Sequence, residues 1–274
     1  MKQRARKRLR VALEKLYERF NRRDYVNPDP LEFLYRFDDL RDREVVGMIA
    51  SSLAFGNVKQ ITKSIDSALR VMGTSPADFL DGSTPRKIED SFSGFKHRWI
   101  TGRELAMMLL GVRRLMRKYG SLEACFGAGF SESDGDVVPA LTRFVDEIAG
   151  ANGTLSTGFV PSPCRKSACK RLNLFLRWMV RNDRVDPGGW KCVPASMLLV
   201  PLDTHMHRLS MLLGFTDRKQ KSLETAREIT CAFREVSPED PVTYDFALTR
   251  LGIRRDEGRK EFLERLEINK KVRS

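Results

Sequence analysis

The chain has 274 residues and carries 49 Lys and Arg against 36 Asp and Glu, which gives a formal net charge of +13. Its hydrophobic fraction of 41% is ordinary for a soluble globular protein, and no apolar run approaches the length of a membrane span. These properties exclude an integral membrane protein and favour a polyanionic partner, because phosphate neutralisation with counterion release supplies most non-specific affinity for nucleic acids. The alternative is a basic enzyme with no nucleic-acid partner.

The predicted elements are helices throughout, beginning with a basic N-terminal helix that places Leu9, Leu13, Leu16 and Phe20 on one face. No β-alternation or internal repeat is evident, so the predicted class is all-α. The predicted helices span residues 5–21, 30–41, 43–55, 57–72, 101–119, 136–149, 166–182, 204–213, 222–235, 241–251 and 256–270.

The five cysteines form no Cys-x-x-Cys pair and no even-numbered framework. We therefore expect reduced thiols in a cytoplasmic protein without an iron–sulfur cluster or any other cofactor. The basic residues at the N-terminus are not followed by the apolar core of a signal peptide.

The helix predicted over residues 166–182 carries a basic stripe opposite its apolar face. Lys166, Lys170, Asn173, Arg177 and Arg181 share this stripe, which contains no acidic residue. The plain interpretation is a solvated polar face. However, the stripe follows a Pro- and Ser-rich loop, and a loop leading into a helix N-terminus is suited to holding a phosphate. We therefore expect this helix to contact a DNA backbone.

The segment Pro201-Leu202-Asp203-Thr204-His205 passes abruptly from apolar to polar residues. One interpretation is that Asp203 or Thr204 caps the following helix. A carboxylate fixed at a helix start is also suited to stabilising positive charge or to deprotonating a nucleophile. A metal site of Asp203, His205 and His207 is disfavoured, because histidines two apart on a helix point to different faces.

Three motifs, taken together, resemble the helix-hairpin-helix DNA glycosylases. They are the runs at 161–168, 200–208 and 240–252, the last of which resembles the closing helix of the archaeal 8-oxoguanine glycosylases. The chain as a whole also resembles an uncharacterised bacterial family, DUF2400, in the phrases at 170–179 and 201–205. The hairpin departs from the glycosylase pattern, because Ser162-Pro163-Cys164 replaces the usual Gly-x-Gly turn.

The resemblance implies a two-lobed helical fold, with residues 1–42 and 204–274 in one lobe and 43–203 in the other. It also implies that a lysine forms a Schiff base with the deoxyribose while Asp203 assists. Aligning the hairpin selects Lys166 as this lysine, whereas aligning the interval to Asp203 selects Lys170, which we prefer. The remaining implied roles are a base pocket of Asp245, Phe175, Trp178 and Gln60, and backbone contacts by His205, Arg177, Arg171 and Arg165. For Phe175, packing in the core is an equally good interpretation.

The resemblance therefore implies a base-excision glycosylase with lyase activity, acting on double-stranded DNA that contains an oxidised purine such as 8-oxoguanine, and we expect a monomer. The alternative is a non-catalytic nucleic-acid-binding protein with the same fold, which the altered hairpin favours.

Overall fold

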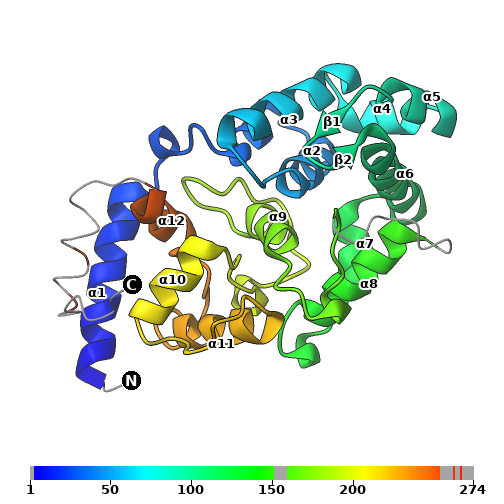
Figure 1. Cartoon of the computed structure of the whole chain (residues 1–274). Helices are drawn as coiled ribbons and strands as arrows, with labels where there is room; N and C mark the ends of the chain where they lie inside the picture. Colours follow the sequence, from blue (N-terminus) through cyan, green and yellow to red (C-terminus); the bar gives the residue numbers. More distant parts are fainter. Residues whose placement is uncertain (1–2, 151–158, 254–261, 263–265, 267–274) are drawn as a thin grey trace.

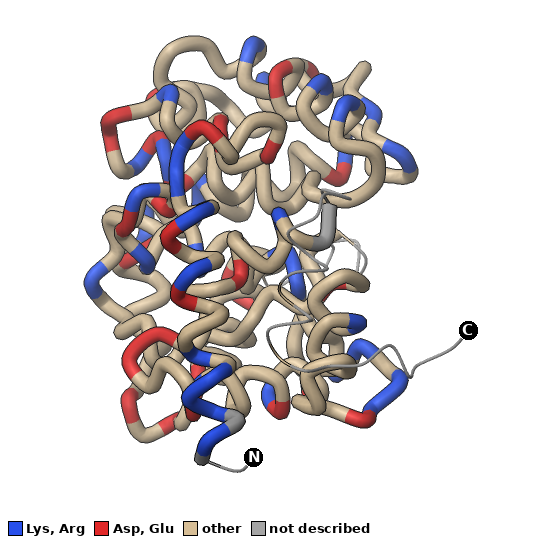
Figure 2. The backbone as a smooth tube through the Cα atoms, turned by 90° about the vertical axis from the view of Figure 1, so that its left-hand side faces the viewer, with Lys and Arg blue, Asp and Glu red and all other residues tan. Residues whose placement is uncertain are grey.

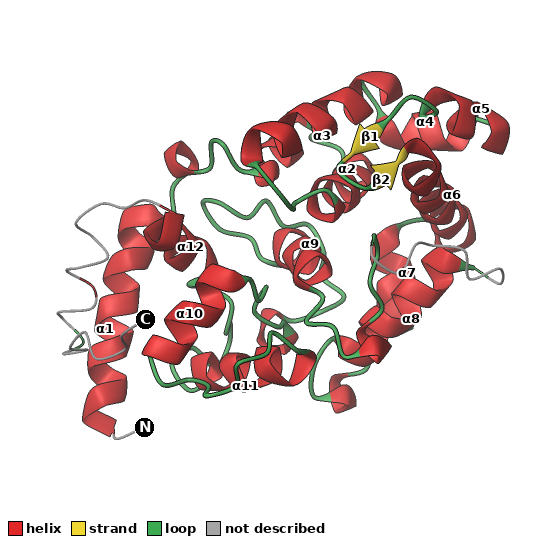
Figure 3. Ribbon diagram, in the orientation of Figure 1, coloured by secondary structure: helices red, strands yellow, loops and turns green. Residues whose placement is uncertain are grey.

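The computed structural model describes residues 3–150 and 159–253, together with Phe262 and Leu266. The chain is mostly helical, which confirms the all-α prediction (Figure 3). The α-helices are α1 (Gln3–Phe20), α2 (Leu40–Ser52), α3 (Val58–Met72), α4 (Pro76–Gly82), α5 (Pro85–Ser91), α6 (Gly102–Tyr119), α7 (Leu122–Ala128), α8 (Val138–Ala149), α9 (Lys170–Val180), α10 (Thr204–Leu212), α11 (Leu223–Arg234) and α12 (Asp245–Ile253). The 3-10 helices are η1 (Arg23–Tyr25), η2 (Pro30–Arg36), η3 (Glu132–Asp134), η4 (Pro163–Arg165) and η5 (Ala195–Met197).

A small antiparallel hairpin of β1 (Lys96–His97) and β2 (Ile100–Thr101) precedes α6. The sequence analysis missed it, because strands of two residues are too short to show an alternating pattern. It also missed α4, α5 and α7, each of seven residues, which begin at the capping side chains of Ser75, Thr84 and Ser121.

Several predicted helices have different bounds in the structure. The helix expected over residues 30–41 is split into η2 and the start of α2, because the Asp39 side chain caps α2 by accepting bonds from the backbone of Arg41 and Asp42. The helix expected from residue 166 begins only at Lys170. The helix expected over residues 256–270 lies outside the described residues, apart from Phe262 and Leu266.

Helix α9 lies in the middle of the molecule, between the group formed by α1, α10, α11 and α12 and the group formed by α2 to α8 (Figure 1). It packs against α2, while α12 packs against both α1 and α10. Helix α1 and α12, the last helix of the described residues, therefore pack against each other although they are far apart in the sequence. The division into lobes at residues 42 and 203 stays a prediction.

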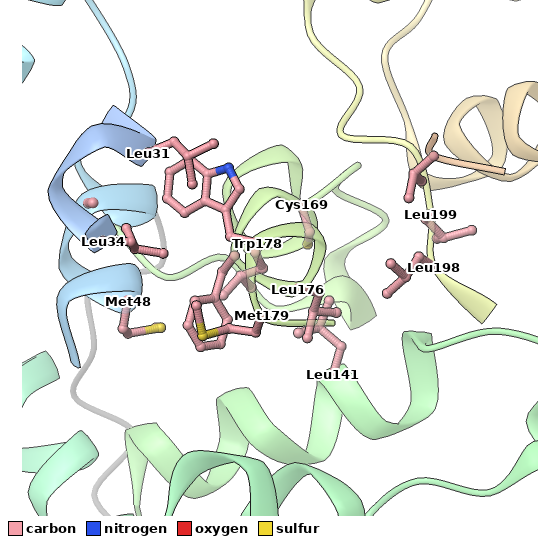
Figure 4. Close-up of a cluster of buried hydrophobic side chains, with 14 of the residues drawn as sticks. Leu31, Leu34, Met48, Leu141, Cys169, Leu176, Trp178, Met179, Leu198 and Leu199 are labelled. Atoms are coloured by element: carbon pink, nitrogen blue, oxygen red, sulfur yellow. The ribbon is translucent and has the colours of Figure 1, made fainter. Parts of the chain in front are cut away.

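The apolar face of α9 is the centre of the hydrophobic core. Leu176, Trp178 and Met179 are fully or almost fully buried and pack among side chains from η2, α2 and α8 (Figure 4). The indole of Trp178 lies toward Leu31 of η2 (Figure 4). Burying each such side chain stabilises the fold by about 1.5–3 kcal/mol, so the position of α9 is firmly fixed.

A buried carboxylate ties α2 to the opposite side of this core. The Glu44 side chain is fully buried and accepts hydrogen bonds from the backbone of Leu122 and Glu123 and from Trp190 Nε1. The bonds from Leu122 and Glu123 cap the N-terminus of α7, where a negative charge is favourable. Burial raises the pKa of Glu44.

Candidate active site

The lysine that begins α9 is positioned by an unusual backbone segment. Lys166 and Cys169 both adopt left-handed conformations, with φ of 61° and 46°. Between them, Ser167 forms a single bridge with Ser222, and the Asn173 amide donates to the carbonyl of Ala168. Because neither left-handed residue is glycine, the conformation is strained and depends on these surrounding contacts.

Asp203 is the N-cap of α10, which confirms the capping interpretation of its segment. Its Oδ1 accepts a hydrogen bond of 2.8 Å from the backbone of Met206. Its Oδ2 lies 3.4 Å from Lys170 Nζ. One carboxylate oxygen therefore holds the helix while the other faces the lysine.

The structure thus brings Lys170 and Asp203 together, and it separates Lys166 from them. Lys166 is exposed in the turn before α9, and its carbonyl accepts from the backbone of Leu223 at the start of α11. The expectation that both lysines share one helical face is wrong, because η4 and the strained residues displace Lys166 from the helix axis.

An inner cavity of about 280 Å³ is lined by both residues of the pair. This volume is near the lower end of the range for small-molecule sites. Its walls combine apolar side chains with charged ones and are formed by Pro28, Asp29, Pro30, Ala54, Phe55, Gly56, Val58, Ile61, Lys170, Leu174, Arg177, Pro201, Asp203, Asp245, Phe246, Thr249 and Arg250.

Phe246 provides an aromatic wall of the inner cavity. The guanidinium carbons of Arg250 and Arg177 lie 4.7 Å and 5.9 Å from its ring centroid. Arg250 also forms an ion pair with Asp29. The cavity is therefore lined by an aromatic ring and by charged groups that are held by partners.

An outer groove of about 510 Å³ is also lined by both residues of the pair. Its cationic or potentially cationic lining residues are Lys170, Arg171, Lys221 and His205, and its acidic lining residue is Asp203. The inner cavity and the outer groove share Ala54, Phe55, Gly56, Lys170 and Asp203. The lysine–aspartate pair therefore stands at the boundary shared by the inner cavity and the basic outer groove.

Arg171, which was expected to contact DNA, is only partly available in this groove. It donates to the carbonyl of Ser52, and its guanidinium lies 4.8 Å from the Phe55 ring centroid. Burial lowers the pKa of Arg171 to about 10, so it stays cationic at neutral pH.

The rest of the predicted basic stripe is buried, which corrects the sequence interpretation. Asn173, Arg177 and Arg181 are 2%, 3% and 5% exposed. Arg177 pairs with Asp186 and Asp245. Arg177 is therefore not a DNA-backbone contact, because acidic residues from the following loop and from α12 neutralise this face.

Arg181 extends the same buried network, pairing with Asp186, Asp183 and Asp240. Asp245 lies at the other end of the network and lines the inner cavity. Burial raises the pKa of Asp245 to about 6, against the opposing effect of Arg177. Asp245 therefore lines the inner cavity with its carboxylate already held by an arginine, and its role in a base pocket stays a prediction.

Three residues expected in the base pocket lie elsewhere. Phe175 and Trp178 are fully buried in the core and line neither the inner cavity nor the outer groove, because both belong to the apolar side of α9. Gln60 is exposed on the first turn of α3, where its neighbours Val58 and Ile61 face the inner cavity instead. Packing in the core is thus the correct interpretation of Phe175.

The remaining predicted contacts lie around the groove. His205 is exposed and lines the groove, whereas His207 is buried and bonds through Nε2 to the carbonyl of Arg218. Arg165 is exposed in η4 and lines neither the groove nor the inner cavity. The two histidines point to different places, and no group of three His, Cys, Asp or Glu side chains in the described part of the chain could hold a metal ion.

Sequence reasoning did not find several residues of the site. Phe55 and Gly56 line both spaces, Arg250 and Phe246 line the inner cavity, and Lys221 lines the groove. A signal existed only for Phe55 and Gly56, which form an aromatic–glycine break between two helices. The others come from distant segments, and their convergence is a property of the packing.

Lys and Arg are distributed over the whole backbone, interspersed with acidic residues, and the first turns of α1 carry a dense basic run (Figure 2). Among the described residues, no helix has both the length and the apolar character needed to cross a membrane.

The fold and site define a mostly helical protein with a lysine–aspartate pair at the boundary of two connected spaces. The model of the family described as "Protein of unknown function (DUF2400)" matches residues 29–254. Because the match spans most of the chain, this protein belongs to the DUF2400 family. Comparisons with curated proteins and with solved structures found no match.

Proposed function

We propose that this protein is a DNA glycosylase with lyase activity that uses Lys170 as nucleophile and Asp203 as its assisting carboxylate. The observation that carries the proposal is the 3.4 Å separation of Lys170 Nζ and Asp203 Oδ2 at the boundary shared by the inner cavity and the outer groove. An enzyme that acts on an extruded nucleotide needs this arrangement, with the reacting sugar at the entrance of an enclosed base pocket.

The outer groove supports the binding of a DNA backbone. Lys170, Arg171 and Lys221 offer cationic groups to phosphates, and His205 is exposed beside them. The net charge of +13 adds long-range attraction for DNA.

The inner cavity supports the binding of an extruded base. Phe246 offers a flat aromatic wall, and Asp245 and Arg177 line the same cavity with hydrogen-bonding groups. Extrusion costs a few kcal/mol and is cheapest at a damaged or mismatched base. The preference for an oxidised purine such as 8-oxoguanine rests on the resemblance of residues 240–252 to the archaeal 8-oxoguanine glycosylases.

In the proposed reaction, the amine of Lys170 attacks C1′ of the deoxyribose. The Nζ–C1′ bond forms as the bond from C1′ to the base breaks, and the electron pair of the broken bond leaves with the base, which takes up a proton. Asp203 accepts the proton that the attacking amine loses and stabilises the positive charge that develops on the sugar. Opening of the sugar ring then gives the imine from which strand cleavage proceeds.

Covalent trapping tests this proposal. The full chain is mixed with borohydride and a duplex containing 8-oxoguanine or an abasic site, and the protein–DNA adduct is resolved by electrophoresis. We expect an adduct that is lost in Lys170→Ala and kept in Lys166→Ala, which is a matched control because Lys166 is a nearby exposed lysine outside both spaces. The absence of an adduct and of base release over a panel of lesions refutes the enzymatic proposal.

One observation favours a non-catalytic nucleic-acid-binding protein as the second candidate. The segment before α9 is a 3-10 turn with two strained residues instead of a glycine turn whose N–H groups could grip a phosphate. If DNA binding is intact while no adduct forms and Asp203→Asn has no effect, this second candidate is the correct one.

A further inference from the structure

The hairpin before α6 displays an exposed tryptophan. Trp99 is 55% exposed, although an indole of this size is usually largely buried. It lies with Arg98 in the two-residue turn between β1 and β2, where Arg98 has a φ of 54°. The exposed part of the ring contributes little to the core and is available for contact with a ligand.

The ring of Trp99 is held in place by its neighbours. Its centroid lies 4.6 Å from that of Phe55, at an interplanar angle of 33°. The buried His97 anchors the hairpin below, bonding through Nδ1 to Ser64 Oγ and through Nε2 to the carbonyl of Phe55. Because the Trp99 ring is already held in place, less conformational entropy is lost when a ligand binds to it.

Trp99 also stands next to the candidate active site. Its partner Phe55 lines both the inner cavity and the outer groove, and so does Gly56. A Cβ atom built on Gly56 would approach within 2.9 Å of Arg98 Nη1, so the Arg98 side chain lies directly against this loop. The hairpin turn therefore lies directly against the loop residues that line both spaces, while Arg98 and Trp99 themselves line neither.

Positively charged side chains lie near the exposed ring. The Arg98 guanidinium lies 5.2 Å from the Trp99 centroid, and the Arg171 guanidinium lies over the ring of Phe55, which packs against Trp99. Lys96 is exposed on the same hairpin. Cations beside a flat ring complement a ligand that has both phosphates and planar bases, since base–aromatic stacking is sequence-tolerant and the cations follow the backbone.

We infer that Trp99 is a stacking platform for an unpaired or unstacked base of bound DNA, outside the cavity that takes the reacting nucleotide. The inference rests on the proposed function for its choice of DNA as partner, and it does not depend on the chemistry of Lys170. A fully paired, stacked duplex offers no free base face, so the platform favours DNA that is locally open.

Binding measurements test this inference. The probe is a labelled duplex with a tetrahydrofuran abasic-site analogue, which cannot form an imine, compared with the same duplex without the lesion. We expect Trp99→Ala to weaken binding to the abasic duplex by about tenfold or more, and Trp99→Phe to restore most of the loss. Val11→Ala is the control, because Val11 is an exposed apolar residue on the distant helix α1 (Figure 1).

Fluorescence gives a second readout that does not depend on activity. The chain has three tryptophans, of which Trp178 and Trp190 are 0% and 3% exposed. Stacking on a base quenches an indole, so abasic DNA should quench the wild-type emission but leave Trp99→Phe almost unchanged. Unaltered binding by Trp99→Ala, or equal quenching in Trp99→Phe, overturns the inference.

The two proposals fail in different ways. A normal borohydride adduct together with unaltered binding by Trp99→Ala refutes the platform alone. Weakened binding and lost quenching without any adduct support the platform and refute the glycosylase. If the wild-type protein binds neither duplex, the platform is refuted directly.

Discussion

Replacing Arg177 by methionine distinguishes a buried ion-pair network from a DNA-binding stripe. Arg177 is 3% exposed and donates to Asp186 Oδ1 through Nε and Nη2 at 3.1 Å and 2.9 Å, and to Asp245 through Nη1. Removing one partner of a buried pair typically costs about 3–5 kcal/mol, because an uncompensated charge stays in the interior. Asp186 keeps Arg181 as a partner, so most of the loss should come from Asp245.

The expected destabilisation also depends on pH. Burial already raises the pKa of Asp245 to about 6 with Arg177 present, and removing the cation raises the pKa further. The variant can then protonate Asp245 and avoid the buried charge. We expect a loss of about 3–5 kcal/mol near pH 8 and a smaller loss near pH 5.

Urea unfolding followed by tryptophan fluorescence measures this effect, since Trp178 and Trp190 are both buried. Arg208→Met is the matched control, because Arg208 is exposed on α10 and its replacement should change stability by no more than about 0.5 kcal/mol. If Arg177→Met is as stable as this control and instead weakens DNA binding, the buried network is refuted and the stripe interpretation is restored.

Four further changes test other parts of the structure. Gly56 has a φ of 102°, so Gly56→Ala should lower the free energy of unfolding by at least about 1 kcal/mol. Gly82 has open space around it, so Gly82→Ala should change the free energy of unfolding little, and equal effects of the two substitutions would contradict the strain argument. Asp203→Asn should lower the free energy of unfolding by no more than about 0.5 kcal/mol, because Asn also caps a helix, whereas Asp203→Ala should lower it by about 1 kcal/mol. Neither variant should form the trapped adduct, and an adduct in either would show that Asp203 serves only as a cap. The pKa of Asp245 is about 6 in the folded state and 3.8 in the unfolded chain, so the wild type loses stability relative to Asp245→Asn as pH rises from about 4 to about 6. Urea titrations measure the difference in the free energy of unfolding between the two proteins, and a difference that is constant or grows with pH would contradict this shift. Lys221→Ala should reduce the slope of log affinity for DNA against log salt by about 1, and an unchanged slope would remove Lys221 from the phosphate contacts.

Long helices with clear amphipathic patterns could be predicted from the sequence, as α6 and α8 illustrate. The capping of α10 by Asp203 could be predicted too, since a cap depends on residues close in sequence. Short elements such as α4 and the hairpin could not be predicted, because they carry too few residues to show a period.

The environment of the α9 stripe could not be predicted for a different reason. The periodicity of Lys170, Asn173, Arg177 and Arg181 fixes which side chains share a face, but it does not say what covers that face. The acids that neutralise it lie on the loop after α9 and next to α12. Of these four residues, only Lys170 pairs with Asp203 and lines both the inner cavity and the outer groove.

The inner cavity has walls from residues as distant in sequence as Pro28 and Arg250, which bears on how the protein is made. A nascent chain emerges from the ribosome N-terminus first, so α9 is synthesised well before α12. Until Asp245 follows, Arg177 lacks one of its two acidic partners and the cavity lacks the Phe246 wall. Competence for the proposed reaction therefore arises only when synthesis has passed α12, and a chain that stops short of this helix has Lys170 without an enclosed pocket.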